Sequence, residues 1–412
     1  MRLEDLANEK VGICVSGGLD SKTVTARLKE AGVDVLCFSA DLAQPDEEDM
    51  SDVVRRMDAT GAQTTVVDLK DSMADGCFAV LEAQASYDGG YWNTTGIARA
   101  VTVQGLIGAM RDQGCTVLAH GATGRGNDQV RFERYTQVLA PDMKVYAPWR
   151  DPDLLEQFPG RQQMAAWLKE RGIEADVGPR KRYSTDANLA GLSHEAEDLE
   201  SLETSCLIVD PKMGVWPKDA PDAMENVEVR IEQGRVVAIN GKHCTPLQAM
   251  LEANRIAGKH GIGIKSALEN RIIGTKSRGV YEAPGMELLG YCLRSVYQVA
   301  LDRRAAALFN DLSRRVADQI YDGRYFDPMT RAARIAIDAL TEPATGTVEV
   351  GLYKGNILFQ SMTECPHSLY NEADSSMEAS DGLNPVSSQG YLEVAGVEAL
   401  VMAKAGQIKP HQ

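Results

Sequence analysis

The sequence predicts an α/β protein in two parts, a parallel sheet covered by helices followed by an α+β region. Up to about residue 180, short apolar runs alternate with longer amphipathic stretches, as in a parallel sheet with helical crossovers. Beyond about residue 175, alternating apolar and polar positions flank glycine turns, which is typical of antiparallel hairpins. A length of 412 residues suits about two or three domains. We therefore expect domains at 1–175 and 176–370, then a linker and C-terminal segment at 371–412.

The first domain is predicted to repeat a strand–helix unit. Its short runs are rich in β-branched residues, which favour buried strands, at 10–15, 35–40, 64–69 and 116–120. Its longer stretches carry apolar residues at helical spacing, at 21–31, 47–60, 97–113 and 161–170. Gly172 is expected to end the last of these helices.

The second region is predicted to combine hairpins with helices. Residues 228–239 alternate around Gln233-Gly234, and residues 347–359 alternate around Lys354-Gly355-Asn356. Helical spacing recurs at 246–258 and 286–321. The polar segment 374–388 is rich in Ser, Pro and Gly, so it is predicted to be a linker to a short C-terminal element.

Composition excludes several classes of protein. The chain has 43 Lys+Arg and 59 Asp+Glu, a formal charge of -16, so a broad surface for nucleic acid or anionic membrane is not expected. A local pocket for a small anion remains open. The sequence has no apolar run of about 18 residues and no basic-then-apolar N-terminus, so a cytoplasmic location is expected.

The eight cysteines are scattered singly and form no C-x-x-C pair for zinc or dithiol chemistry. We expect mostly buried thiols in a reducing compartment, and no protein metal site. The cysteines are at positions 14, 37, 77, 115, 206, 244, 292 and 365.

The segment Ser16-Gly17-Gly18-Leu19-Asp20-Ser21 follows a predicted strand and opens a predicted helix. Free backbone N–H groups and the positive helix end converge there, glycines admit close approach, and serines add donors. A tight capped turn is the alternative interpretation. The full string favours phosphate binding, and it resembles the pyrophosphate loop of the N-type ATP pyrophosphatases, which adenylate a substrate.

A second dense run, residues 120–133 (HGATGRGNDQVRFE), is predicted at the end of another parallel strand, where ligands of open α/β sheets collect. It combines glycines with a hydroxyl, an amide, a carboxylate and guanidiniums. A glycine-rich turn before a helix capped by Asn127 or Asp128 is the alternative.

Taken together, the motifs resemble those of the argininosuccinate synthase family over about residues 8–370. They are SGGLDS, HGATGRGNDQVRFE, APWRD, YSTDANLAGLSHEAEDLE and ENRIIGTKSRGVYEAPG, in this order. YWNTTG and YEAPGMELL further resemble the longer bacterial branch. The resemblance implies a Rossmann-like domain of the adenine nucleotide alpha hydrolase type, a synthetase domain and a short C-terminal oligomerisation element.

The family ligates citrulline to aspartate, with ATP cleaved to AMP and pyrophosphate through a citrulline adenylate. The resemblance therefore implies ATP as substrate with Mg²⁺, and a cytoplasmic homotetramer. It implies that the ATP site is formed by Cys14, Val15, Ser16, Gly17, Gly18, Leu19, Asp20, Ser21, Lys22, Ala40, Gly121 and Asp186.

The same resemblance assigns the two amino-acid sites. Aspartate would contact Thr123, Asn127 and Asp128. Citrulline would contact Tyr91, Asn127, Arg131, Ser184, Ser193, Glu195, Glu269 and Tyr281. Catalytic roles fall to Asp20, Asp128 and Arg131, and no general base is identified.

A few positions depart from the family pattern. Lys22 replaces a hydroxyl residue, Gly96 stands where many members have serine, and 264–266 reads Ile-Lys-Ser rather than Arg-Ile-Asp. These changes leave room for a related adenylating ligase acting on another ureido or amide substrate. A tRNA thiolase, a glutamine-dependent synthetase and a non-catalytic ATP sensor fit the acidic chain and its second-domain motifs less well.

Overall fold

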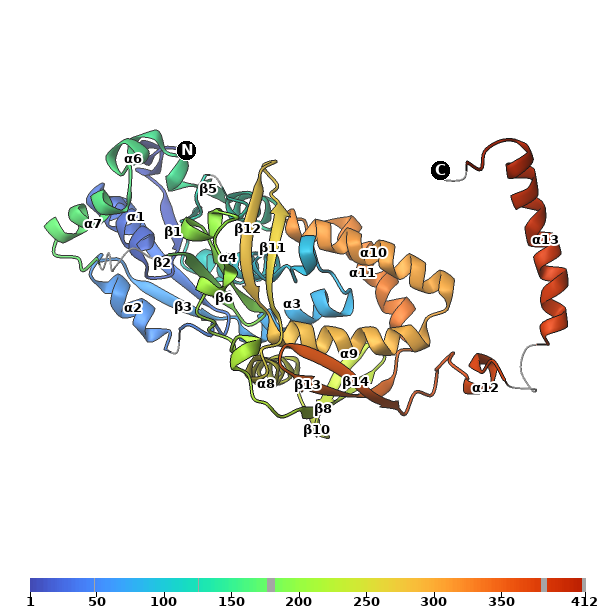
Figure 1. Ribbon diagram of the computed structural model, residues 1–412. Coiled ribbons are helices and arrows are strands. Elements are labelled where there is room, and N and C mark those ends of the chain that lie inside the picture. Colours follow the sequence, from blue (N-terminus) through green and yellow to red (C-terminus); the bar gives the residue numbers. More distant parts are fainter. Residues whose placement is uncertain (48, 125, 176–181, 379–383, 410–412) are drawn as a thin grey trace. The chain divides into compact units, whose positions relative to one another are not determined.

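The computed structural model describes residues 1–47, 49–124, 126–175, 182–378 and 384–409. The chain forms two compact units, Met1–His367 and Ser368–Gln412. The first unit holds three sheets and most of the helices (Figure 1). The predicted domain boundaries at 1–175 and 176–370 stay a prediction.

The first sheet is parallel, with the strand order β3-β2-β1-β4-β5. Its strands are β1 (Lys10–Cys14), β2 (Asp34–Asp41), β3 (Thr64–Asp68), β4 (Val117–His120) and β5 (Lys144–Tyr146). The four predicted strands and the parallel α/β architecture are confirmed. The order reverses between β1 and β4, where Cys14 lies beside His120, so the loops after these two strands meet at one edge.

Helices connect these strands and cover the sheet. They are α1 (Leu19–Glu30), α2 (Ser51–Asp58), α3 (Lys70–Glu82), α4 (Thr94–Asp112), α5 (Asp128–Leu139), α6 (Pro152–Gln157) and α7 (Arg161–Glu170). The predicted helix start at residue 47 is wrong, because Asp49 accepts hydrogen bonds from the Ser51 amide and hydroxyl and α2 begins only there. Residue 48 lies outside the described residues. Helix α3 was not predicted.

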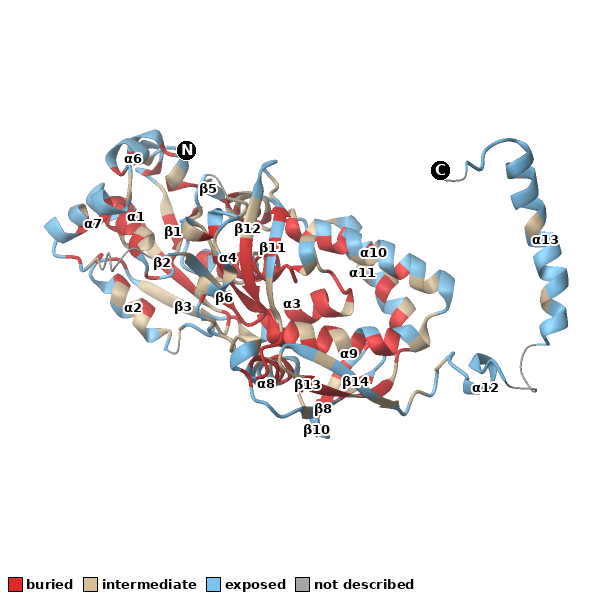
Figure 2. Ribbon diagram, in the orientation of Figure 1, coloured by how far each residue is buried: buried red, intermediate tan, exposed pale blue. Residues whose placement is uncertain are grey.

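The second sheet is antiparallel, with the order β11-β12-β7-β6. Its strands are β6 (Ser184–Asn188), β7 (Gly191–Glu195), β11 (Ile264–Asn270) and β12 (Lys276–Glu282). The sequence did not predict these strands. The C-terminal half of β12 is buried within the first unit (Figure 2).

The third sheet contains both predicted hairpins, in the order β10-β9-β8-β13-β14. Its strands are β8 (Glu225–Glu232), β9 (Arg235–Ile239), β10 (Lys242–His243), β13 (Gly346–Tyr353) and β14 (Asn356–Thr363). Two-residue turns close the hairpins, with positive φ at Gln233 and Gly234 and at Lys354 and Gly355. This is the left-handed geometry that twisted hairpins need.

Helices α8 (Pro246–Lys259), α9 (Pro284–Ala300), α10 (Arg303–Tyr321) and α11 (Pro328–Thr341) complete the first unit. The helical stretch predicted at 286–321 is confirmed, and it forms two helices: Leu301 is extended, and Asp302 accepts from the amides of Arg304 and Ala305 to cap the second. Helix α11 was not predicted.

The second unit contains α12 (Glu372–Ser375) and α13 (Pro385–Lys404). The predicted linker 374–388 therefore ends within a helix, which Asn384 caps by accepting from the Val386 amide. Residues 379–383 of that linker lie outside the described residues. Helix α13 has no buried residue, and it exposes the apolar side chains Val386, Tyr391, Leu392, Val394, Val397, Leu400 and Val401.

All eight cysteines are free thiols, of which four are buried and four are intermediate, so fewer are buried than expected. Within the described residues, no helix has the length and apolar character of a membrane span.

Candidate functional site

The turn between β1 and α1 has the strand–turn–helix geometry expected of a phosphate loop. Helix α1 starts at Leu19, so Ser16, Gly17 and Gly18 form the turn. Gly17 has φ +73°, which favours glycine. The Ser16 amide donates to Ser21 Oγ at 3.1 Å, which holds the turn against the first turn of the helix. The first-turn amides of α1 therefore face the same sheet edge as the loop after β4.

Charged side chains border this loop. Asp20 lies in the first turn of α1, with Arg161 at 3.9 Å, and burial raises the pKa of its carboxyl despite that arginine. Lys22 Nζ donates to the Glu174 carbonyl at 2.8 Å. Arg56, which sequence reasoning missed, donates to the Ser16 carbonyl.

Two residues assigned to the ATP loop are positioned by the core. Val15 and Leu19 are buried apolar side chains, so only their backbones are available to a ligand. Burial raises the pKa of the Cys14 thiol to about 12, which keeps it neutral and unsuited to nucleophilic chemistry. Ala40 lies near the end of β2, and Gly121 and Thr123 are exposed in the loop after β4, at the same sheet edge.

Six of the predicted contacts lie on one face of the four-stranded sheet. In this sheet Ser184 is paired with Glu195, Asp186 with Ser193, and Ser193 with Tyr281. Directly paired residues of antiparallel strands point to the same face, and alternate positions on one strand do as well. The residues sharing this face are Ser184, Asp186, Ser193, Glu195, Glu269 and Tyr281.

Helix α5 brings Asp128 and Arg131 to this face of the sheet. Arg131 Nη1 donates to Asp128 Oδ1 at 3.0 Å, and Arg99 Nε of α4 donates to Asp128 Oδ2 at 3.0 Å. Burial alone would raise the pKa of Asp128, but Arg99 and Arg131 outweigh it and hold the pKa below its usual value. Asp128 is therefore a carboxylate fixed between two guanidiniums.

Arg99 joins the two halves of the candidate site and was missed by sequence reasoning. Its Nη2 also donates to Asp186 Oδ2 at 2.7 Å, so it connects the first residue of α5 with β6. Burial opposes its charge, but Asp128 and Asp186 raise the pKa of the guanidinium above its ordinary value. No local pattern around Arg99 marks it, since it lies in the middle of a buried helix.

Two glutamates on the sheet face hold protons unusually tightly. Burial, with Glu195 nearby, raises the pKa of Glu269 to about 7. Burial, with Asp128 and Asp186 nearby, also raises the pKa of Glu195. Ionisable groups with shifted pKa values in a buried cluster are typical of functional sites.

A cluster of tyrosines lines the other side of this site. Tyr91 is buried, and its hydroxyl accepts from the Thr95 amide at 2.9 Å. Its ring lies 4.4 Å from that of Tyr281. Asn127 Nδ2 donates to Tyr321 Oη at 2.9 Å, and Tyr321 was also missed from the sequence. Eleven side chains from Tyr91 to Tyr281 are predicted to contact a substrate. Thr123 and Ser184 are exposed, and the other nine are at least partly buried.

Two departures from the family pattern have a structural setting. A Cβ on Gly96 would lie 3.0 Å from the Ile320 carbonyl oxygen, so position 96 faces helix α10 in this chain. Lys265 lies on the same sheet face as Tyr281, its pairing partner, and binds Glu287 at 2.7 Å. Its charge is thus neutralised close to the candidate site.

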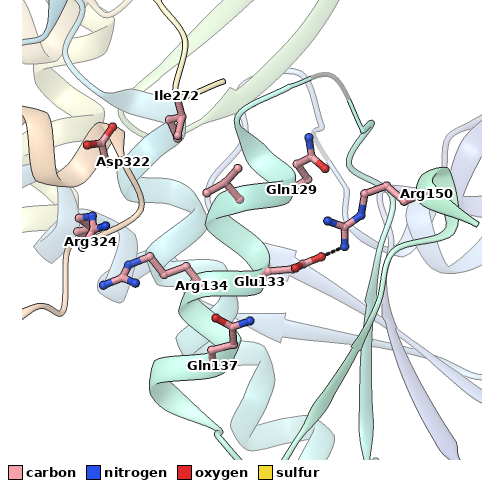
Figure 3. Close-up of a pocket in the computed structure, with 9 residues that line it drawn as sticks. Gln129, Glu133, Arg134, Gln137, Arg150, Ile272, Asp322 and Arg324 are labelled. Carbon is pink, nitrogen blue, oxygen red and sulfur yellow. Dashed lines mark ion pairs between the residues drawn. The ribbon is translucent and has the colours of Figure 1, made fainter. Parts of the chain in front are cut away.

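A separate hollow of about 370 Å³ borders the opposite face of α5 (Figure 3). Its walls include an ion pair between Glu133 and Arg150, and they contain no residue predicted for the site. The lining residues are Gln129, Val130, Glu133, Arg134, Gln137, Arg150, Ile272, Asp322 and Arg324. Among the described residues, no group of three or more His, Cys, Asp or Glu could hold a metal ion.

Comparison of the chain with known proteins shows which family it resembles. Residues 10–174 match the Arginosuccinate synthase N-terminal HUP domain, and residues 183–402 match the Arginosuccinate synthase C-terminal domain. The argininosuccinate synthase of Rhodopirellula baltica is 36% identical over 403 residues, covering 97% of this chain and 98% of the relative. The matches span both the phosphate-type loop and the antiparallel sheet, and the chain belongs to the argininosuccinate synthase family.

Proposed function

We propose that this chain ligates citrulline and aspartate to argininosuccinate, with ATP cleaved to AMP and pyrophosphate. The observation that supports it best is that two groups of functional residues lie next to each other in one chain of this family. A phosphate-type loop at the sheet edge adjoins a partly buried cluster of two arginines and four carboxylates that suits amino-acid substrates. A related ligase for another ureido substrate is not favoured by the full-length match.

The proposed chemistry proceeds in two displacements. The ureido oxygen of citrulline attacks the α-phosphorus of ATP, the bond between the α- and β-phosphates breaks, and pyrophosphate leaves. The amine of aspartate then attacks the ureido carbon, and AMP leaves with the former ureido oxygen while the amine loses its proton. The protein contributes positions, charges and exclusion of water.

The site residues are proposed to divide by chemistry. The loop Cys14–Lys22, with Ala40, Gly121 and Asp186, would hold ATP. Asp128 would attract the ammonium of aspartate beside Thr123 and Asn127, and the fork of Arg131 would bind the carboxylate of citrulline. The sheet-face glutamates would accept from the ureido and ammonium N–H groups.

We propose that Mg²⁺ accompanies ATP rather than occupying a protein cage. Asp20, in the first turn of α1 beside the phosphate loop, fits a single supporting carboxylate, which is the usual protein share for nucleotide-bound magnesium. When bound, the ion would neutralise charge on the phosphates.

The protein is proposed to be cytoplasmic, and its free thiols are in keeping with a reducing cytoplasm.

Pyrophosphate release by the purified chain tests the proposed function. ATP, citrulline and aspartate are supplied singly, in pairs and together, and AMP, pyrophosphate and argininosuccinate are measured. We expect sustained release only with all three substrates, with one argininosuccinate formed per pyrophosphate. An absence of citrulline-dependent release from folded protein would contradict the proposal.

The ionisation of Glu269 is expected to set an acid limb in citrulline use. Because the pKa of this buried carboxyl is about 7 and its ionised form accepts substrate N–H groups, kcat/KM for citrulline should rise about tenfold per pH unit below that value and then level off. Glu269→Gln should remove the limb. Glu82→Gln is the matched control, since burial likewise raises the pKa of Glu82 to about 7, on α3 outside the site. Equal profiles for the two variants would rule this assignment out.

The exposed apolar helix α13 supports a homotetramer in which this element contacts other copies. Light scattering is expected to give a mass about four times the 44.7 kDa of one chain. Leu392→Asp should produce smaller species, whereas Glu393→Gln on the same helix should not. A monomeric wild-type chain would refute this proposal.

A further inference from the structure

Tyr321 ends helix α10 and contacts three residues assigned to the proposed citrulline site, Asn127, Arg131 and Glu269. It is fully buried, although its hydroxyl and carbonyl are polar. Its hydroxyl accepts from Asn127 Nδ2 at 2.9 Å and donates to Glu269 Oε2 at 2.8 Å. One hydroxyl thus joins the loop before α5 to strand β11.

The hydrogen bond from the Ile272 amide to Asn127 determines which groups donate and which accept along this chain. The Ile272 amide donates to Asn127 Oδ1 at 3.0 Å, so the other end of the Asn127 side chain is the donating NH₂ group. Tyr321 must then accept from Asn127 and pass its own proton toward Glu269. Burial and the neighbouring Glu269 both raise the pKa of Tyr321, so the hydroxyl stays protonated.

Tyr321 also fixes Arg131. The Tyr321 carbonyl accepts from Arg131 Nε at 2.9 Å, and the guanidinium lies 5.0 Å above the centre of the Tyr321 ring. On its other side the ring is stacked on Tyr87, with centroids 3.8 Å apart. The ring is therefore held between an aromatic side chain and the arginine that it orients.

Arg131 and Glu269 each keep one buried polar atom that these hydrogen bonds do not use. Arg131 Nη2 and Glu269 Oε1 have no hydrogen-bond partner among the described residues. Arg131 donates to the Tyr321 carbonyl through Nε and to Asp128 through Nη1, and Glu269 accepts from the Tyr321 hydroxyl through Oε2. A donor and an acceptor buried without partners are costly unless a ligand meets them.

The end of α10 is shaped for this contact. Gly323 has φ +74°, and the Arg324 amide returns to the Gln319 carbonyl at 2.7 Å, which is a Schellman-type helix end. A Cβ on Gly323 would lie 3.2 Å from Arg131 Cα. Only glycine therefore lets the turn after Tyr321 approach α5 so closely.

We infer that Tyr321 is a positioning residue that fixes three binding side chains of the proposed citrulline site relative to one another. The inference rests on the proposed function and adds a residue to it. The Tyr321 hydroxyl holds Glu269 so that its other oxygen is available to the substrate, and the Tyr321 carbonyl and ring hold Arg131 so that Nη2 is available. The geometry comes from helix α10, remote in sequence from every motif of the site.

Tyr321→Phe removes the hydroxyl and keeps the stacked ring. We expect the KM for citrulline to rise about tenfold or more, with the KM for ATP changed less than about twofold. The Tyr321 hydroxyl lowers the pKa of Glu269, which burial raises, so its loss should move the acid limb of kcat/KM to higher pH. Tyr146→Phe is the matched control, because its buried hydroxyl donates to a carboxylate of Asp151 at 2.8 Å outside the site.

Gly323→Ala provides an independent test by pressing the helix end against Arg131. Its control is Gly172→Ala, where φ is +70° but an added Cβ meets nothing within 4 Å. Both changes strain the backbone, and only Gly323→Ala should raise the KM for citrulline. Unchanged citrulline KM and pH profile in folded Tyr321→Phe and Gly323→Ala would overturn the inference. A wild-type chain without citrulline-dependent pyrophosphate release would instead overturn the proposed function.

Discussion

Asp128→Asn is expected to reduce kcat/KM for aspartate about 100-fold or more, which corresponds to roughly 2.7 kcal/mol. The carboxylate accepts from Arg99 through one oxygen and from Arg131 through the other. An amide presents only one acceptor and turns an NH₂ group toward the other guanidinium. The site would also lose the charge that attracts the substrate ammonium. Steady-state kinetics with aspartate varied would measure the effect.

The same change should destabilise the fold, because the buried Arg131 would lose its carboxylate partner, whereas Arg99 would keep Asp186. Leaving a buried charge without its partner costs about 3–5 kcal/mol. Asp327→Asn is the matched control: Asp327 also pairs with two arginines, Arg134 at 2.5 Å and Arg324 at 3.3 Å, outside the proposed site. It should lower Tm with little change in aspartate kinetics. Equal kinetic effects in the two variants would remove Asp128 from the aspartate site.

Arg131→Ala is expected to raise the KM for citrulline about tenfold or more, or about 1.4 kcal/mol. Two nitrogens of its guanidinium are held by the Tyr321 carbonyl and by Asp128, and the buried Nη2 is left for the substrate. Arg131→Lys should fail to restore the affinity, because an ammonium lacks the planar fork.

Arg134→Ala is the control for this substitution. Arg134 lies one turn further along α5, at the separate hollow (Figure 3). Its partner is Asp327. Its loss should leave the KM for citrulline unchanged. An unchanged KM in Arg131→Ala as well would mean that the resemblance misassigns this position.

The parallel domain could be predicted from the sequence because its central strands β1 and β4 are buried on both faces. Runs such as 116–120 are short and mostly apolar, and turns separate them from amphipathic helices. Strands β6 and β11 escaped prediction for the opposite reason. Their site face carries polar side chains, Ser184 and Asp186 on β6 and Lys265 and Glu269 on β11, so the sequence lacks the apolar alternation that indicates a strand.

The site could be predicted in part, where its residues lie in compact motifs. The phosphate-type loop and Asp128 stand in dense local strings, whereas Arg99 and Tyr321 do not. Arg99 lies 29 residues from Asp128 and 87 from Asp186, and Tyr321 lies 52 from Glu269. Only the packing of α4 and α10 against the site brings these side chains into it, and no periodic pattern encodes such a meeting.

Transfer of the ureido oxygen tests the central claim most directly. Citrulline labelled with ¹⁸O in the ureido group is turned over with ATP and aspartate, and AMP and pyrophosphate are analysed by mass spectrometry. If this chain adenylates citrulline, the label should appear in the phosphate of AMP, with none in pyrophosphate. Argininosuccinate formed together with unlabelled AMP would contradict the account, because the ureido oxygen would then have left without bonding to the α-phosphorus.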